Sequence, residues 1–354
     1  MVFPYASLYI LALGGDATSI GFVNSLLPLA GLIMFPLAGY IADHASRVKI
    51  IVLAGYLSAA IILMYVLAPS WEVIAVVALL QGFLVFQFPA KSAFIADSLS
   101  PEERGQGIAT MNTISSALAI FAPYIAGVVI GIYGANTGVR TLYGVMMVLY
   151  LTSAFIHLRF LKETSPASGG QLKVADFPRV LKNSYSGIPA MLKQFPPSLR
   201  ALTGIIVLSF MANGVASSFW VVYAVEQIGL SSATWGLILL IETALKLVMF
   251  IPAGILVDRW GRTTSLLAAL LLSLVSIPLF VFATGFTTVL LIRATIAVAF
   301  ATAIPACTAL MADTVPRGIR GRVMAAIGQG GIMIGAAGGG TGGPAMGFII
   351  TIPL

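Results

Sequence analysis

The sequence predicts an all-α membrane protein that crosses the bilayer many times and consists of two related six-helix bundles. Of its 354 residues, 59% are apolar and only 9% are charged, whereas a soluble domain normally carries about a quarter charged residues. Helices are the expected spanning elements, because lipid leaves no backbone amide without an internal partner and the apolar runs are too long for barrel strands.

Ten apolar runs follow one another along the chain, each close to the length of about 20 residues that a span requires. They lie at 19–42, 50–68, 73–96, 106–133, 141–161, 201–224, 234–257, 264–284, 288–312 and 322–350. Residues 163–198 interrupt this pattern with prolines and lysines, which predicts a cytoplasmic linker with one or two short interfacial helices. We therefore expect an N-terminal bundle at residues 1–162 and a C-terminal bundle at residues 199–354.

Two sequence marks occur in both halves at the same spacing. The first reads GYIADHASRVK in one half and GILVDRWGR in the other, and the second reads PAKSAFIAD and PACTALMAD. Asp43 and Asp258 of the first mark are 215 residues apart, and Asp97 and Asp313 of the second mark are 216 residues apart. Agreement across intervals of this length indicates a duplicated unit.

The basic residues of the loops predict which side of the membrane each loop faces. Fifteen lysines and arginines fall on the side of Asp43, and only Arg140 falls in a loop on the opposite side. Basic loops stay in the cytoplasm, so Asp97, Asp258 and Asp313 are also expected there. The net charge of +7 is therefore a topology signal, and we expect no nucleic-acid partner.

The two halves differ at the chain ends. The first span of the second half begins 57 residues before Asp258, and the same interval before Asp43 would begin about 14 residues upstream of Met1. Residues 1–13 reach only about 20 Å as a helix, less than the ~30 Å hydrocarbon core. We therefore expect the first helix to be clipped and the twelfth helix to be missing after Leu354.

The two marks resemble the signature loops of the major facilitator superfamily. The Gly-x-x-x-Asp-(Arg)-x-x-Arg loop after the second helix of each half is similar to its first mark, and the Asp…Arg-Gly segment after the fourth helix to its second. His44 stands where Arg is usual, while the second copy keeps Arg259. The resemblance implies twelve helices in two bundles, a substrate cavity between them, and rocking between inward-open and outward-open states.

We expect the marks to act as a conformational latch on the cytoplasmic side. The glycines let a neighbouring helix approach closely, the carboxylates can face a positive helix N-terminus, and the arginines can bridge to the carboxylates. Such contacts would bias an equilibrium between two states; the alternative is that they only fix topology and loop structure. The latch residues are Gly39, Asp43, Arg47, Asp97, Arg104, Gly254, Asp258, Arg259, Arg262, Asp313 and Arg320.

Ionisable residues inside the spans are candidates for substrate or proton handling, because a charge at that depth should face protein or a wet cavity. Glu242 and Lys246 lie one helical turn apart, where they can form an ion pair with either a transport role or a purely structural one. The resemblance places the eighth helix against the fifth, so this pair is expected to face Asn112. Lys91 and Arg293 can instead snorkel toward the membrane surfaces.

Other polar residues in the spans are expected to line the cavity or to make ordinary interhelical hydrogen bonds. They are Tyr5, Gln81, Gln87, Asn213 and Gln329.

Enzyme signatures are missing from the sequence. No Gly-x-x-x-x-Gly-Lys-Ser/Thr loop is present for ATP-driven pumping. His44, His157 and the single Cys307 are too isolated to form a zinc or iron site, so we expect no cofactor and no metal. The sequence predicts a monomeric secondary active transporter of the inner or plasma membrane that moves a small solute by alternating access.

Proton coupling is expected through Glu242, the one carboxylate buried inside a span. The APYIAG segment in the fifth helix is faintly similar to the antiporter-associated motif of the superfamily and favours export. One alternative is a facilitative or symport uptake carrier of a small metabolite, with the Glu242–Lys246 pair purely structural. Another is a non-transporting membrane receptor or partner protein.

Overall fold

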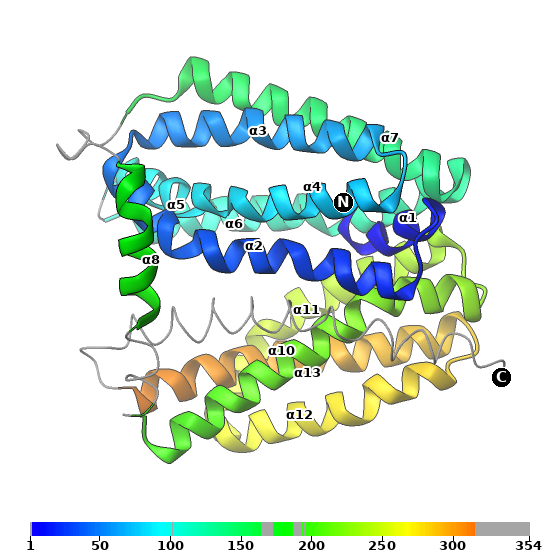
Figure 1. Ribbon diagram of the computed structural model, residues 1–354. Coiled ribbons are helices and arrows are strands. Elements are labelled where there is room, and N and C mark those ends of the chain that lie inside the picture. Colours follow the sequence, from blue (N-terminus) through cyan, green and yellow to red (C-terminus); the bar gives the residue numbers. More distant parts are fainter. Residues whose placement is uncertain (1, 101, 164–172, 187–192, 194, 316–354) are drawn as a thin grey trace.

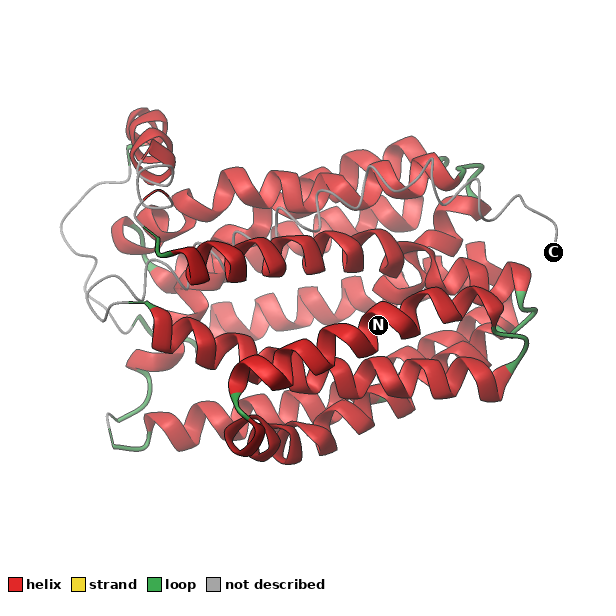
Figure 2. Ribbon diagram, turned by 90° about the horizontal axis from the view of Figure 1, so that it is seen from below, coloured by secondary structure: helices red, strands yellow, loops and turns green. Residues whose placement is uncertain are grey.

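The computed structural model describes residues 2–100, 102–163, 173–186, 193 and 195–315, and the elements in these ranges are helices, without strands (Figure 1, Figure 2). Eight helical stretches there are long and apolar enough to cross a membrane. The predicted class, an all-α polytopic membrane protein of two bundles, is confirmed. The run expected at 322–350 lies outside the described residues.

The first half begins with a short apolar segment and continues through long helices. The short segment is a 3-10 turn, Phe3–Tyr5, followed by α1 (Ala6–Ala12). The next elements are α2 (Ala17–His44), α3 (Arg47–Leu67), α4 (Trp71–Phe83), the 3-10 turn Leu84–Phe86, α5 (Gln87–Asp97), α6 (Arg104–Ile120) and α7 (Ala122–Phe160). The elements from Trp71 to Asp97 form one continuous span.

The fifth and sixth spans meet inside α7, where the chain reverses at Gly134. This glycine has φ 78° and ψ 168°, a backbone conformation that side-chain-bearing residues rarely adopt. The reversal brings Gly138 back against Ile130, since a Cβ on Gly138 would lie 2.8 Å from the Cα atom of Ile130. The returning arm then packs on α3, where Gly55 meets Ala154 closely.

Side-chain caps fix the start of several helices. The carboxylate of Asp16 accepts a 2.7 Å hydrogen bond from the backbone N–H of Ser19 at the start of α2, and this bond lowers the pKa of Asp16. At the start of α3, the carboxylate of Glu163 accepts from the hydroxyl of Ser46 and from the backbone N–H of Val48. These acceptors satisfy donors that a helix N-terminus leaves free.

The second half contains four described spans. They are α10 (Pro197–Val222), extended by the π-helical turn Tyr223–Gln227; α11 (Ser232–Trp260); α12 (Arg262–Leu279), extended by the 3-10 turn Phe280–Phe282; and α13 (Phe286–Thr314). Between the halves, the 3-10 turn Val174–Asp176 leads into α8 (Phe177–Ser186).

Helix α8 crosses the end of the first bundle roughly at right angles to the spans (Figure 1). The hydroxyl of Tyr40 in α2 donates to the Asp176 carboxylate over 3.2 Å, and its ring meets Phe177 edge to face. The hydroxyl of Tyr185 donates to the carbonyl oxygen of Leu32. The linker is thus attached to α2, and a short helix in the linker was predicted.

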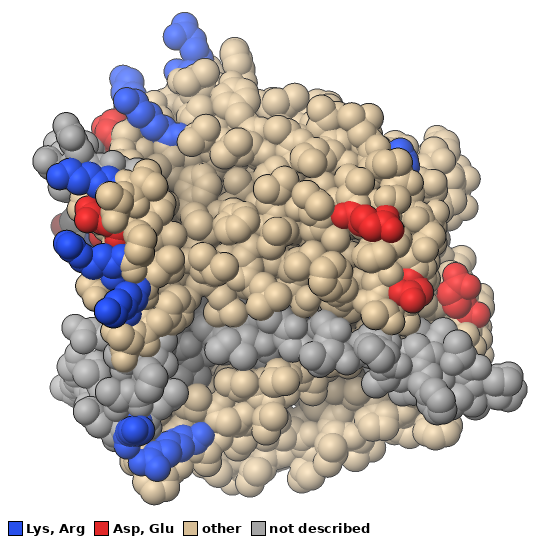
Figure 3. Space-filling model, viewed as in Figure 1, with Lys and Arg blue, Asp and Glu red and all other residues tan. Residues whose placement is uncertain are grey.

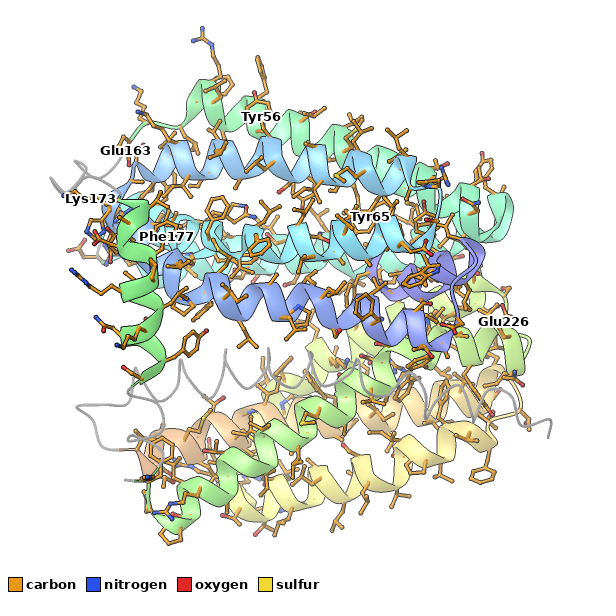
Figure 4. The ribbon with its side chains drawn as sticks, in the orientation of Figure 1. Tyr56, Tyr65, Glu163, Lys173, Phe177 and Glu226 are labelled. Carbon is orange, nitrogen blue, oxygen red and sulfur yellow. The ribbon has the colours of Figure 1, made fainter. Side chains whose placement is uncertain are left out.

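Charge is distributed unevenly between the two ends of the molecule. On the face in Figure 3, Lys and Arg gather at the end that carries α8, while acidic residues dominate the opposite end. Glu163, Lys173 and Phe177 lie at the α8 end, and Glu226 lies at the other (Figure 4). The α8 end is therefore the cytoplasmic end by the positive-inside rule.

Buried apolar residues join the two halves at the outer end only. One large cluster contains residues of both halves, among them Tyr5, Phe219 and Trp235. At the cytoplasmic end, one cluster runs from Phe195 to Val315 in the second half and another contains Ala42, Ile50 and Ala90 of the first half. Within the described residues, no cluster joins the halves there, so the two bundles are in an inward-open arrangement.

Polar contacts support the same joint at the outer end. The hydroxyl of Tyr5 lies 2.9 Å from the carbonyl oxygen of Pro123 and 3.2 Å from that of Ser232, and the Ser7 hydroxyl donates to the Ser218 carbonyl over 2.5 Å. A Cβ on Gly127 would lie only 2.3 Å from the carbonyl oxygen of Ser232. Small residues therefore allow close backbone contact between the halves.

We predict that Gly127→Val opens this joint, because its side chain would collide with backbone that cannot move aside cheaply. In a Cys307→Ser background, Ser7→Cys should be protected from a membrane-impermeant maleimide applied outside, and Gly127→Val should raise its labelling. Gly131→Val is the matched control on the same helix, because within the described chain nothing lies within 4 Å of its Cβ position. Equal labelling in both valine variants would contradict the close outer contact.

Candidate functional site

A single buried carboxylate holds two cations together inside the second bundle. Glu242 in α11 is 3% exposed. Its Oε1 lies 2.6 Å from Nζ of Lys246, and its Oε2 accepts a 2.7 Å hydrogen bond from Nε of Arg293 in α13. A second guanidinium nitrogen of Arg293 contacts the same Oε2 oxygen. We call these three residues the charge cluster.

Helix geometry explains one arm of the cluster, and helix packing explains the other. Glu242 and Lys246 are four residues apart on α11, a separation that places side chains on one face. Arg293 is 51 residues further along, and it reaches Glu242 because α13 packs against α11. Arg293 was expected to snorkel to the outer surface; instead it turns inward, because a buried carboxylate compensates its charge where lipid cannot.

Aromatic rings cover both cations. The guanidinium carbon of Arg293 lies 4.2 Å from the ring centroid of Trp220 and 5.5 Å from that of Trp235. The ammonium group of Lys246 lies 4.9 Å from the ring centroid of Phe300. Cation–π contacts of this kind contribute about 0.5–2 kcal/mol when water is excluded. The sequence analysis missed these aromatic residues, since only the tertiary fold places them over the cations.

The charge cluster lies beside the interface between the two halves. On α11, Gly236 contacts the first half through the carbonyl oxygen of Pro123. Thr243 and Leu247 continue the same face two and three turns further along, where both are exposed. Opposite them, none of the residues of α6 is buried. Lys246 thus stands at the edge of the face that the second half presents to the first.

The expected partner Asn112 does not join the cluster. It lies on α6, is exposed, and in the described part of the chain makes no hydrogen bond or ion pair with Glu242 or Lys246. The packing of the eighth helix against the fifth is present, but at the outer end, where Gly236 meets Pro123 and Tyr124.

The other polar candidates lie apart from the cluster. Gln81 accepts a hydrogen bond from the hydroxyl of Tyr65 over 3.1 Å, and Gln87 donates to the Leu84 carbonyl of its own span. Lys91 is half-buried in α5, and Asn213 is exposed on α10. Gln329 lies outside the described residues.

The cytoplasmic marks form matching ion pairs in the two halves. Arg47 at the start of α3 contacts Asp97 at the end of α5, and Arg262 at the start of α12 contacts Asp313 near the end of α13. The pairs occupy equivalent positions in the repeat, which supports the duplication. Each pair joins two helices of one bundle rather than the two bundles.

The remaining latch residues make fewer contacts among the described residues. Asp43, Asp258 and Arg259 are exposed, and Arg104 has a buried Nε without a hydrogen-bond partner in the described chain. The close helix approach expected at the mark glycines is not formed there either. Within the described chain, no atom lies within 4 Å of a Cβ built on Gly39 or Gly254. Arg320 lies outside the described residues.

Two helical bundles related by duplication, joined at the outer end and flanked by an intramembrane charge cluster, define a carrier of the two-bundle class. The chain belongs to the Major Facilitator Superfamily, because the model of that family matches residues 1–202 and again residues 202–353. The expected family is therefore confirmed, and the protein is a multi-pass membrane transporter by family.

Two relatives are similar in sequence. An uncharacterized MFS-type transporter of Methanocaldococcus jannaschii is 25% identical over 274 residues, which cover 75% of this chain and 64% of the relative. The multidrug resistance protein MdtG of Enterobacter lignolyticus is 29% identical over 171 residues, covering 46% of this chain and 37% of the relative. The matches thus span less than two thirds of either relative's length.

Solved structures share the fold. The nucleoside transporter NupG superposes with a TM-score of 0.74 at 17% identity, covering 98% of this chain and 86% of the other. A bacterial homolog of the human lysosomal transporter Spinster, in an inward-facing and occupied conformation, gives 0.76 at 14% identity, covering 98% and 77%. At these identities the likeness establishes the fold alone.

We predict that Glu242→Leu destabilises the protein by about 3–5 kcal/mol, because it leaves two cations in the bundle without a counter-charge. Lys246→Met should cost less, since the Lys246 side chain is 27% exposed and Glu242 keeps Arg293. The double variant Glu242→Leu/Arg293→Leu should regain most of the loss. Thermal unfolding in detergent measures all three, and a Glu242→Leu protein as stable as the wild type would show that the cluster is not ionised as described.

Proposed function

We propose that this protein is a proton-coupled secondary active transporter that moves a small solute by alternating access, with Glu242 as the coupling carboxylate. The observation that carries the proposal is the contact of one buried carboxylate with two cations beside the interface of the two bundles. An inward-open arrangement, joined only at the outer end among described residues, supports the alternating part of the proposal.

Comparison of the two halves argues that the cluster serves function rather than the fold. With the offsets of the two marks, Glu242, Lys246 and Arg293 correspond to Leu27, Gly31 and Val77 in the first half. The first half builds the same pair of helices without charge. Its helices instead approach closely, since a Cβ on Gly82 would lie 2.3 Å from the carbonyl oxygen of Leu27. A bundle of this fold therefore does not require the three charges.

Protonation of Glu242 would change the force between α11 and α13. While it is ionised, the carboxylate binds both Lys246 on its own helix and Arg293 on the neighbouring one. A neutral carboxyl group would release most of that attraction and leave two cations that repel each other. Since Lys246 stands beside the other half, this change can bias the equilibrium between inward-open and outward-open states.

Export from the cell is the direction that the proposal favours. The APYIAG segment supports it, and so does the similarity to a multidrug resistance protein. We place the protein in the plasma or inner membrane, with the basic end in the cytoplasm. A monomer suffices, because one chain supplies both halves and the outer joint between them.

A facilitative carrier is the second candidate function. The contacts of Glu242 with two cations favour it, because such contacts stabilise the ionised form and oppose uptake of a proton. In that case the charge cluster holds α11 and α13 together, and solute moves only down its own gradient.

Glu242→Gln separates these two functions. The glutamine keeps the shape of the side chain but cannot exchange a proton, so gradient-driven solute accumulation should fall at least about tenfold, a change of about 1.4 kcal/mol in driving free energy. Exchange of labelled for unlabelled solute should persist. Uptake into proteoliposomes with and without an imposed pH gradient measures both, and accumulation equal to wild type would remove Glu242 from the coupling step.

The latch is tested by Asp43→Asn and Asp258→Asn. Each removes a cytoplasmic charge without adding bulk, and we expect transport to slow by about tenfold while solute binding stays nearly unchanged, because the carboxylates lie at the cytoplasmic end of the bundles. Glu226→Gln, an exposed carboxylate at the outer end, is the matched control. Equal losses of binding and transport would contradict a conformational role.

A further inference from the structure

We propose that the charge cluster is the binding site for the anionic group of an organic anion, a carboxylate carried on an apolar or aromatic body, and that Lys246 makes the direct contact. The inference rests on the proposed transport function and specifies its substrate class. It comes from the charge, the donors and the exposure of the cluster.

The charge of the cluster is unbalanced. One carboxylate faces one ammonium and one guanidinium group, so the three side chains together carry one excess positive charge. An uncompensated charge inside a bundle is costly, and the first half avoids it with apolar residues at the equivalent positions, Leu27, Gly31 and Val77. A bound anion would bring the cluster to neutrality, whereas a cationic solute would add to the imbalance.

The cluster also contains more donors than acceptors. A lysine has three N–H donors and an arginine five, while the carboxylate is the only acceptor side chain among the three residues. In addition, the indole nitrogen of Trp235 is buried without a hydrogen-bond partner in the described chain, and its ring lies 5.5 Å from the Arg293 guanidinium carbon. An acceptor-rich group such as a carboxylate satisfies donors of this kind.

Exposure singles out Lys246 as the contact residue. Its side chain is 27% exposed, against 13% for Arg293 and 4% for Glu242. Its ammonium group lies against the ring of Phe300, which is itself 39% exposed. An anion that reaches Lys246 therefore also meets an aromatic surface, and this pairing favours a solute with an apolar or aromatic body beside its charged group.

The site belongs to the second half alone, but the first half faces it. Thr243 and Leu247 flank Lys246 on α11 and are exposed toward the gap that the inward-open arrangement leaves. On α6, Thr110 and Thr113 are exposed and bond only to backbone of their own helix. These hydroxyl groups offer weak polar contacts without charge, so the first half adds no competing counter-ion on this face.

Benzoate, benzamide and benzylamine test the proposal, because they share a ring and differ in charge. Naphthalene-2-carboxylate extends the series to a larger body. Thermal shift and tryptophan fluorescence on the purified full chain in detergent report binding, since Trp220 and Trp235 lie over Arg293. We expect a carboxylate to bind at least about tenfold more tightly than the amide of equal size, and the amine to be the weakest.

Variants of Lys246 locate the site. Lys246→Gln should abolish the preference for the carboxylate, Lys246→Arg should restore it, and Lys182→Gln on the exposed face of the linker helix should leave it unchanged. The arginine variant separates a binding defect from a folding defect. Three results would overturn the inference: binding of neither carboxylate, a preference for the amide or the amine, or wild-type binding in Lys246→Gln.

The outcome is independent of proton coupling, because binding in detergent involves no gradient. Carboxylate binding without gradient-driven flux would contradict the proposed coupling and leave the anion site standing. Gradient-driven flux of a neutral or cationic solute, without carboxylate binding, would do the reverse.

Discussion

The structure of the second bundle depends on one carboxylate that compensates two cations within the membrane. Glu242 binds Lys246 along its own helix and Arg293 across to α13. Lipid offers no counter-charge, so each cation needs this carboxylate, an aromatic face or both. The position of Trp220 over Arg293 follows from the same need. Any process that neutralises Glu242 therefore changes how α11 and α13 are held together.

Duplication supplies the frame, and departure from symmetry supplies the chemistry. Both halves carry the same cytoplasmic ion pair, Arg47 with Asp97 and Arg262 with Asp313. These pairs are partly exposed, and such pairs contribute little to stability individually, so their value lies in fixing how helices meet at the cytoplasmic end. The charge cluster has no equivalent in the first half. A symmetric scaffold with one asymmetric charged site is suited to a carrier whose two halves move relative to each other.

Much of the architecture could be predicted from the sequence, because lipid imposes its own rules on length and polarity. The spans, the duplication, the cytoplasmic linker and the family follow from apolar runs and two repeated marks. The pair Glu242–Lys246 was predictable because their separation of four residues fixes their geometry. The contact with Arg293 was not, because it depends on how α11 packs against α13. For the same reason Asn112 was assigned to the cluster, although the halves diverge before it can reach Glu242.

Infrared difference spectroscopy on isotope-labelled protein tests the central claim most directly. With glutamate carboxyl groups labelled by ¹³C, the spectrum of the wild type minus that of Glu242→Gln, recorded in lipid at neutral pH, isolates the Glu242 carboxyl group. An ionised carboxylate bound by two cations predicts carboxylate stretching bands in this difference and no protonated carbonyl band. A protonated carbonyl band at neutral pH would contradict the account, because a neutral Glu242 cannot compensate Lys246 and Arg293.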